Sequence, residues 1–297
     1  RAIMLASLAD GKSEISGFLE GEDCLATIEV FQKMGVSIFR QEGKFIVEGK
    51  GLKGLKDPSG ALYFGNSGTS VRLCSGVLAA QEFASSLTGD SSLSSRPMTR
   101  ITEPLGLMGA NTSTTKQGTL PIQIEPVDSL KSIKYALPVA SAQVKSCLLF
   151  AGLYSQGMTE IEENVTTRDH TERMFKQFGI NLDISQSKNT KIIKLNGVES
   201  ISPANINICG DFSSASFFIL AALITPNSEL LLKNVGVNPT RIGFLHALRH
   251  MGANIELLSK EDSFEPTADI LVKTSNLKGI TLNTNLVANM IDEMPAF

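Results

Sequence analysis

One short sequence motif occurs four times along this 297-residue chain and limits its possible folds more than any other feature. It is a helix end in which a glycine stands between two hydrophobic residues, at Met34-Gly35-Val36, Met108-Gly109-Ala110, Phe178-Gly179-Ile180 and Met251-Gly252-Ala253. The four glycines lie 74, 70 and 73 residues apart. Glycine commonly ends helices because it adopts positive φ angles without strain. The spacing therefore predicts a structural unit of about 70 residues that is repeated along the chain.

Each repeat also contains a second helix that opens on small polar residues. These helices are expected at residues 71–80, 144–154 and 216–223, just after Ser70, Ser141 and near Ser213. Small polar side chains favour helix N-termini because their oxygens accept hydrogen bonds from free backbone N–H groups. Runs with strand-like alternation lead into each unit, separate its helices and end it. The order β-α-β-α-β-β predicts an α/β (α+β) fold built from pseudo-symmetric units.

Composition excludes several classes of protein. Hydrophobic residues make up 42% and charged residues 19%, which is typical of a globular chain. The net charge of −3 and the absence of a basic run argue against a nucleic-acid or anionic-membrane surface. The longest apolar run, residues 217–224, is too short to span a bilayer. The four cysteines are too widely spaced for a zinc site and suit a reducing cytoplasm.

The repeat is interrupted at both ends of the chain. One repeat length before Ser70 falls just before Arg1, and one repeat length after Ser213 falls near Asn285. We therefore expect a fragment that holds four units and the beginning of a fifth. Residues 1–208 are expected to form a three-repeat domain, and residues 209–297 an incomplete second domain.

Two polar loops suggest an anion-binding site. Gly68 lies in a glycine-rich stretch between a strand and a helix, where backbone N–H groups can approach an anion closely. The alternative is an ordinary tight turn. Arg96 follows the next strand and can donate two parallel hydrogen bonds to a phosphate or carboxylate, although, taken alone, a solvated arginine in a loop is the more common case.

Further polar residues stand at equivalent places in later repeats. Ser141 and Gln143 open one helix, where Ser141 alone suits a simple N-cap. Arg168 lies beside His170, which could act as a base or could only cap and pack. Asp292 is a candidate base, or an acid that favours a helix start. His246 and His250 have a metal-like spacing, but no third ligand accompanies them, so no metal site is expected.

The motifs as a set resemble the 5-enolpyruvylshikimate-3-phosphate (EPSP) synthase family. The matching phrases are Gly65-Asn66-Ser67-Gly68-Thr69, Gly89-Asp90-Ser91-Ser92, Arg96-Pro97-Met98, Ser141-Ala142-Gln143-Val144-Lys145-Ser146, Arg168-Asp169-His170-Thr171-Glu172-Arg173, Gly210-Asp211-Phe212-Ser213-Ser214-Ala215 and Ile291-Asp292-Glu293. The resemblance implies two domains, each an inside-out α/β barrel of three repeats with pseudo-threefold symmetry. It also implies a monomeric cytoplasmic enzyme without a cofactor.

The resemblance implies a reaction as well as a fold. Enzymes of this family move the enolpyruvyl group of phosphoenolpyruvate to the 5-hydroxyl of shikimate 3-phosphate, on the route to chorismate and the aromatic amino acids. The residues implied for shikimate 3-phosphate are Arg1, Ser141, Ala142, Gln143, Arg168 and Asp292. The residues implied for phosphoenolpyruvate are Gly68, Arg96 and Gln143, at the place where the inhibitor glyphosate also binds. Asp292 is implied as the proton acceptor.

Two alternatives remain open from the sequence. The related UDP-N-acetylglucosamine enolpyruvyl transferases share the fold but carry a cysteine in the loop that here spans residues 89–97, where this chain has none. An RNA-end-binding protein on similar repeats would need a basic face, which the net charge does not favour. The family also has a lysine before the position of Arg1 and basic residues beyond Phe297, so we expect the present stretch alone to be inactive.

Overall fold

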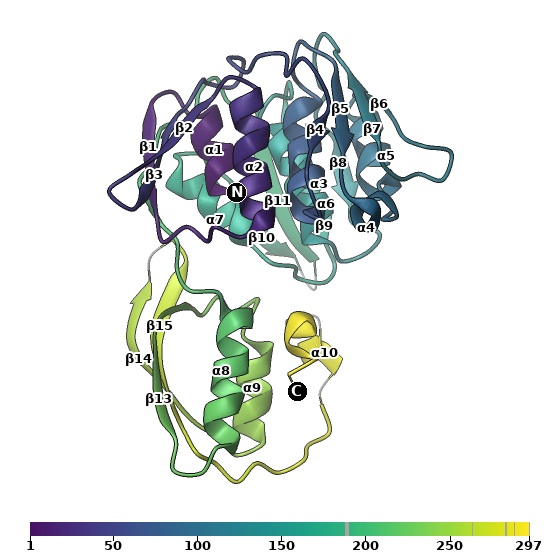
Figure 1. Ribbon diagram of the computed structural model, residues 1–297. Coiled ribbons are helices and arrows are strands. Elements are labelled where there is room, and N and C mark those ends of the chain that lie inside the picture. Colours follow the sequence, from purple (N-terminus) through teal and green to yellow (C-terminus); the bar gives the residue numbers. More distant parts are fainter. Residues whose placement is uncertain (188–189, 263, 283, 288, 297) are drawn as a thin grey trace. The chain divides into compact units, whose positions relative to one another are not determined.

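The computed structural model describes residues 1–187, 190–262, 264–282, 284–287 and 289–296 (Figure 1). The chain forms two compact units. The first unit consists of Arg1–Thr166 and Met174–Asn207, and the second of Thr167–Arg173 and Ile208–Phe297. Within the described residues, no helix has both the length and the apolar character needed to cross a membrane.

The first unit holds three repeats of the predicted order. The first repeat contains α1 (Ala2–Leu8), β1 (Lys12–Ser16), α2 (Glu22–Lys33), β2 (Ser37–Gln41) and β3 (Lys44–Glu48). The second contains β4 (Leu62–Tyr63), α3 (Gly68–Leu78), β5 (Ser85–Thr88), α4 (Ser91–Ser94), α5 (Thr99–Leu107), β6 (Asn111–Ser113) and β7 (Ile122–Glu125). The third contains β8 (Lys134–Ala136), α6 (Ala142–Gly152), β9 (Met158–Glu163), α7 (His170–Gln177), β10 (Asp183–Ser187) and β11 (Thr190–Asn196), and β12 (Ile206–Asn207) follows.

Each repeat of the first unit contributes to a four-stranded sheet, in the orders β12-β1-β3-β2, β4-β5-β7-β6 and β10-β11-β9-β8. Each sheet contains one parallel pair of strands, which is β12 with β1, β4 with β5, or β8 with β9. The other pairs are antiparallel. The predicted β-α-β-α-β-β repeat is therefore confirmed as the unit of this mixed α/β fold.

The position of β12 differs from the prediction. A strand-like run is expected to lead into each repeat, and residues 205–208 stand at that place before the fourth repeat, at the end of the expected first domain. In the structure Ile206 pairs with Ile15 of β1, so this strand completes the sheet of the first repeat. Alternating hydrophobicity predicts that a segment is extended, but the choice of partner depends on contacts far away in the sequence.

The four repeated glycines close their helices as predicted. Gly35, Gly109, Gly179 and Gly252 have φ angles of 85°, 88°, 76° and 91°. In each case the N–H of the residue after the glycine donates to a carbonyl five residues earlier: Val36 to Phe31, Ala110 to Leu105, Ile180 to Phe175 and Ala253 to Leu248. This is the Schellman arrangement, which satisfies carbonyls that the helix itself leaves free.

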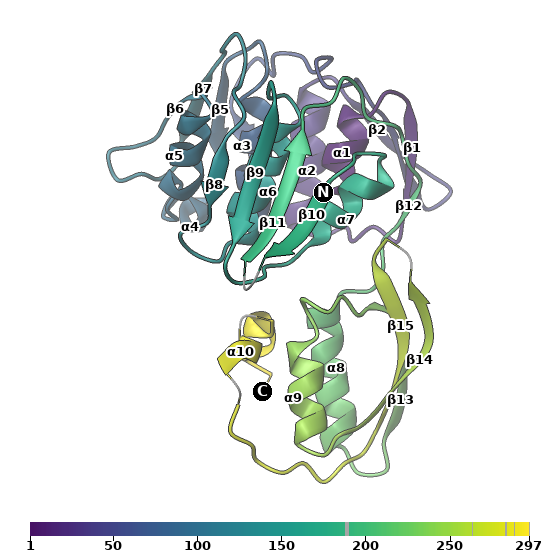
Figure 2. The ribbon, with the colours of Figure 1, turned by 180° about the vertical axis from the view of Figure 1, so that it is seen from behind.

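Helices α3 and α6 form the interior of the first unit, with the sheets around them (Figures 1 and 2). Almost every residue of both helices is buried, including the polar Arg72 and Lys145. The helices touch closely, because a Cβ on Gly76 of α3 would lie 2.1 Å from the carbonyl oxygen of Cys147 on α6. A glycine at this contact therefore sets the distance between the helices.

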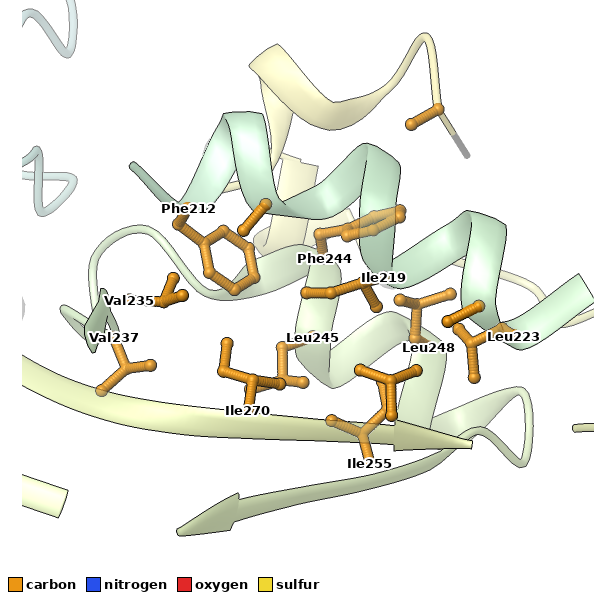
Figure 3. Packing of buried hydrophobic residues seen from close by; sticks show 14 of the residues in the cluster. Phe212, Ile219, Leu223, Val235, Val237, Phe244, Leu245, Leu248, Ile255 and Ile270 are labelled. Atoms are coloured by element: carbon orange, nitrogen blue, oxygen red, sulfur yellow. The ribbon is translucent and has the colours of Figure 1, made fainter. Parts of the chain in front are cut away.

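The second unit packs two helices on one face of an antiparallel sheet. Its elements are α8 (Phe212–Ile224), β13 (Glu229–Gly236), α9 (Gly243–His250), β14 (Asn254–Asp262), β15 (Pro266–Lys273), α10 (Thr284–Val287) and a short 3₁₀ helix, η1 (Ile291–Glu293), with the strands in the order β13-β15-β14. Phe212 and Ile219 of α8, Phe244 and Leu248 of α9, and Ile270 of β15 are buried together (Figure 3).

Candidate active site

A linked pair of polar loops surrounds the start of α3 in the first unit. Ser67 caps this helix, since its Oγ accepts from the N–H of Ser70 at 3.2 Å. Asn66 donates to Asp90 at 2.9 Å and accepts a hydrogen bond from Arg96. Asp90 in turn caps α4 through the N–H of Leu93 at 2.7 Å. Asn66 thus joins the glycine-rich loop to the loop that carries Arg96.

Gly68, the first residue of α3, leaves room for two guanidinium groups. A Cβ at this position would lie 2.9 Å from Nη1 of Arg72 and 3.0 Å from Nη1 of Arg96. The φ angle of Gly68 lies outside the positive range, so its backbone conformation does not demand glycine. Space for the two arginines is therefore the reason for a glycine here.

Arg72 lies almost fully buried inside this site, with 2% of its surface exposed. Its Nη1 donates to Gln143 Oε1 at 2.9 Å and to the carbonyl of Gly68 at 3.2 Å, and its Nη2 donates to the carbonyl of Pro97 at 3.2 Å. Burial, with help from the charges of Arg100 and Arg96, lowers the pKa of Arg72 to about 10. Arg72 remains a cation at neutral pH.

Arg72 and Arg96 also lack acidic partners in the part of the chain that the structure describes. Neither forms an ion pair there with Asp or Glu, and Nε of Arg72 has no hydrogen-bond partner. Buried charges are normally paired. Two adjacent guanidinium groups without carboxylates are therefore suited to bind an anion.

Gln143 connects this anion site to helix α6. Its Nε2 donates to Thr69 Oγ1 at 3.1 Å, while its Oε1 accepts from Arg72. The structure therefore brings the predicted residues Gly68, Arg96 and Gln143 into one cluster.

The other predicted residues of the first unit lie at helix starts. Ser141 is the N-cap of α6, because its Oγ accepts from the N–H of Val144 at 3.3 Å. Ala142 is the first residue of that helix. Arg1 stands at the N-cap of α1, a different helix, and its carbonyl accepts from the N–H of Leu5 at 3.0 Å.

A second group of charged residues lies in the second unit and surrounds Asp292. Oδ2 of Asp292 accepts from Nη2 of Arg168 at 2.5 Å and from Nη1 of Arg241 at 3.0 Å. Partial burial alone would raise the pKa of Asp292, but the hydrogen bonds and charges of Arg168 and Arg241 outweigh burial and lower it. Asp292 is thus a carboxylate at neutral pH, held between two guanidinium groups.

Arg241 is further fixed by a buried acid. Its Nη2 donates to Ser213 Oγ, and that hydroxyl donates to Oε1 of Glu293. Glu293 is 1% exposed and lies 3.6 Å from Arg241. Ser213 and Glu293 therefore hold Arg241 in the orientation that reaches Asp292.

This geometry can be compared with proteins of known family. The family model described as EPSP synthase (3-phosphoshikimate 1-carboxyvinyltransferase) matches residues 1–297. A 3-phosphoshikimate 1-carboxyvinyltransferase of Methylococcus capsulatus is 50% identical over all of this chain and 67% of its own length. The corresponding protein of Vesicomyosocius okutanii is 52% identical with the same coverage.

The chain belongs to the EPSP synthase family. A solved structure of EPSP synthase from Acinetobacter baumannii agrees with this assignment, with a TM-score of 0.90 and 48% identity over 99% of this chain and 66% of that one. The chain therefore spans about two thirds of the length of the relatives it matches. The assignment favours the EPSP synthase family over the two alternatives left open by the sequence.

Two arginines of this EPSP synthase family member were missed from the sequence. Arg72 stands in a helix that is otherwise apolar, and nothing in the local pattern separates it from a structural residue. The position of Arg241, in contrast, could have been found from the repeat. Arg96, Arg168 and Arg241 follow the first inner strand of consecutive repeats and lie 72 and 73 residues apart.

The two histidines with metal-like spacing have a simple position. His246 and His250 are exposed on α9. In the described ranges of the chain, they are not part of a cluster of three or more His, Cys, Asp or Glu side chains.

Proposed function

We propose that this protein transfers the enolpyruvyl group of phosphoenolpyruvate to the 5-hydroxyl of shikimate 3-phosphate and releases phosphate. The family model spans the chain, and relatives about half identical to it carry the name of this activity. Both proposed substrates are anions of low molecular mass. The observation that carries the proposal in this structure is the pair Arg72 and Arg96, which has no acidic partner among the described residues.

The first unit supports a role in holding phosphoenolpyruvate. Arg72 and Arg96 supply guanidinium groups that pair well with phosphate or carboxylate oxygens. Gly68 exposes its backbone beside them without a side chain, and Gln143 offers an amide that already contacts Arg72. We assign these four residues to the phosphoenolpyruvate site.

We assign the binding of shikimate 3-phosphate to a second set of residues, which offer a hydroxyl, an amide and positive charge. Ser141 and Gln143 provide a hydroxyl and an amide at the start of α6, beside the backbone of Ala142. Arg168 and Arg1 provide positive charge for the phosphate. These assignments rest on the family resemblance, and the helix-start positions support them because free backbone N–H groups there favour anions.

Asp292 is assigned as the proton acceptor. Oxygen 5 of shikimate 3-phosphate attacks C2 of phosphoenolpyruvate while a general acid gives a proton to C3, and Asp292 takes the proton of the hydroxyl. The conjugate base of that acid then removes a proton from C3 as phosphate leaves, which restores the double bond, and Asp292 returns its proton to solvent. A base that is bound to two arginines is weak. Engagement of Arg168 by the substrate phosphate would raise the basicity of Asp292 when the substrate is present.

The test is Asp292→Asn in the chain extended to the length of its relatives. The substitution keeps the shape of the side chain but removes the base, so kcat measured by phosphate release should fall by about 10²-fold or more. Shikimate 3-phosphate binding, measured by calorimetry, should change much less. The control is Asn276→Ala on an exposed loop. An unaltered kcat would assign the proton transfer to another group.

Other features of the function are also proposals. We propose a cytoplasmic monomer on the basis of the family resemblance, and the net charge of −3 supports a lack of affinity for nucleic acids. We further propose that residues 1–208 act as a three-repeat domain and residues 209–297 as part of a second one. The repeated sheets of the first unit support this division.

A further inference from the structure

A buried asparagine in the second unit lies between two carboxylates. Asn238 follows β13 and is 2% exposed. Its Nδ2 donates to Oδ1 of Asp169 at 2.7 Å and to Oε2 of Glu265 at 3.0 Å. Its Oδ1 accepts from the N–H and the hydroxyl of Thr240 at 2.9 and 2.8 Å. The amide therefore uses both of its donor hydrogens to bridge acids that are 96 residues apart.

Each of the two carboxylates also contacts a basic side chain. Asp169 accepts from Nε of Arg173 at 2.9 Å. Glu265 lies 2.6 Å from Nδ1 of His170. We call Asp169, His170, Arg173, Asn238 and Glu265 the Asn238 cluster. Its charges are arranged so that the neutral amide separates two carboxylates, each with its own basic partner.

The cluster holds a short segment of chain beside the residue that reaches Asp292. Residues 167–173 belong to the second unit, although α7 continues into the first. Arg168 directly precedes Asp169 and lies before the start of α7, so helical hydrogen bonds do not fix its direction. The contacts of Asp169 and His170 with Asn238 and Glu265 tie the two residues that directly follow Arg168 to the rest of the second unit.

We propose that Asn238 is a positioning residue for the reaction. By binding Asp169 and Glu265 at once, it holds residues 168–170 so that the guanidinium of Arg168 meets Asp292. Asn238 itself touches neither Arg168 nor Asp292 in any hydrogen bond described above. The consequence for shikimate 3-phosphate binding rests on the function proposed above, whereas the effect on Asp292 does not.

The first measurement needs no substrate. The carboxyl of Asp292 is titrated by carbon-13 NMR in the wild type and in Arg168→Ala, which gives the full rise of its pKa on loss of that arginine. In Asn238→Ala we expect at least half of this rise, because Arg168 is released from Asp292. The control Asn276→Ala removes an exposed asparagine of the same unit and should leave the titration unchanged.

A second variant separates bridging from turn formation. Asn238→Ser keeps a hydroxyl that can accept from the N–H of Thr240 but is too short to span both carboxylates. We expect it to shift the titration of Asp292 as Asn238→Ala does. If Asn238→Ala alone shifts it, the turn at Thr240 is responsible and the proposal is wrong. If neither folded variant shifts it, the proposal is also wrong.

The third measurement relates the cluster to the substrate. Calorimetry should show shikimate 3-phosphate binding to Asn238→Ser about tenfold more weakly than to the wild type, with the Asn276→Ala control unchanged. If the wild type and Asn238→Ser bind shikimate 3-phosphate equally well, Asn238 has no role in substrate binding. Absence of binding by the wild type would contradict the proposed function, and the NMR titration would then still decide whether Asn238 positions Arg168.

Discussion

At the scale of single residues, Gly68 shows how the lack of a side chain shapes a site. The ends of Arg72 and Arg96 occupy the space that a methyl group would need, at 2.9 and 3.0 Å. Both are the far ends of flexible side chains, so a larger residue would displace them rather than unfold the helix. A substitution here should therefore change anion binding more than stability.

We predict that Gly68→Ala, in the chain extended to the length of its relatives, weakens the binding of glyphosate more than the binding of phosphoenolpyruvate. Glyphosate is longer than phosphoenolpyruvate, so the added methyl and the displaced arginines should affect it more. A difference of ~1.4 kcal/mol would be tenfold in relative affinity. The glyphosate inhibition constant and the Michaelis constant for phosphoenolpyruvate are measured together, with Gly106→Ala as control, because nothing lies within 4 Å of a Cβ there. Equal effects on both ligands would contradict the assignment of Gly68.

Acid should remove one stabilising contact of the second unit. Since Arg168 and Arg241 lower the pKa of Asp292 despite partial burial, their contacts stabilise the folded state above the unfolded pKa of about 3.9. This contribution to stability should be lost as the pH falls through the pKa of Asp292 in the folded state, which is lower than its pKa in the unfolded state. We expect the gap in unfolding free energy between wild type and Asp292→Asn to be larger at pH 7 than at pH 3, by urea titration. An equal gap at both pH values would mean that the arginines do not stabilise the carboxylate.

Local chemistry explains which site residues the sequence could reveal. Ser141 and Asp211 carry the N-cap signal, and both cap their helices, Asp211 through the N–H of Ser214 at 2.7 Å. The roles of Arg72 and Asn238 could not be inferred, because their partners are distant in sequence. A side chain's burial and its long-range contacts follow from packing, which no local pattern encodes.

At the scale of elements, the contact between α3 and α6 controls the anion site. Gly76 stands one turn after Arg72 on α3, and Cys147 stands one turn after Gln143 on α6. The close approach of Gly76 to Cys147 therefore lies directly beside the 2.9 Å contact between Arg72 and Gln143.

We predict that Gly76→Ala weakens both the fold and the site. Its Cβ would meet the backbone oxygen of Cys147 at 2.1 Å, which can be relieved only by moving a helix. Such overpacking costs about 1–3 kcal/mol. Urea unfolding should show this loss, and phosphate affinity, measured by calorimetry, should fall as Arg72 and Gln143 separate. Gly106→Ala, on an exposed helix face, should instead be neutral or slightly stabilising. Similar behaviour of the two variants would show that the helix contact tolerates a methyl group.

The elements were predictable where the signal is local. The glycine helix ends and the strand alternation gave the repeat, because φ angles and amphipathic faces depend on neighbouring residues. The pairing of β12 was assigned wrongly, because its two residues carry no information about their partner. The structure groups residues 167–173 with the second unit, where Asp169 accepts a hydrogen bond from Asn238, and no local sequence pattern indicates this grouping.

At the scale of the whole molecule, the two units differ in how well they cover apolar surface. Phe217, Phe218 and Ile224 of α8 are 54%, 60% and 64% exposed. The corresponding helices α3 and α6 of the first unit bury nearly all of their residues. Exposed aromatic side chains on a helix offer sites for chymotrypsin when the helix opens locally.

We predict that limited proteolysis cuts the second unit first. Chymotrypsin should cleave within residues 208–297 and leave a product that retains β12, because this strand belongs to the first sheet. Mass spectrometry of the product checks the cut sites. Equal resistance of both units would contradict the prediction, and so would a stable product that ends before Asn205.

The pairing of β12 with β1 also determines when the first sheet can be finished during synthesis. The hydroxyl of Ser16 donates to the carbonyl of Ile206, a contact that spans 190 residues. At about 5–20 residues per second, a ribosome would need about 10–40 s to make the intervening chain. Among the three sheets of the first unit, the one that contains β1 is therefore begun first and completed last, and until then β1 presents an open edge to the ribosome surface and to chaperones.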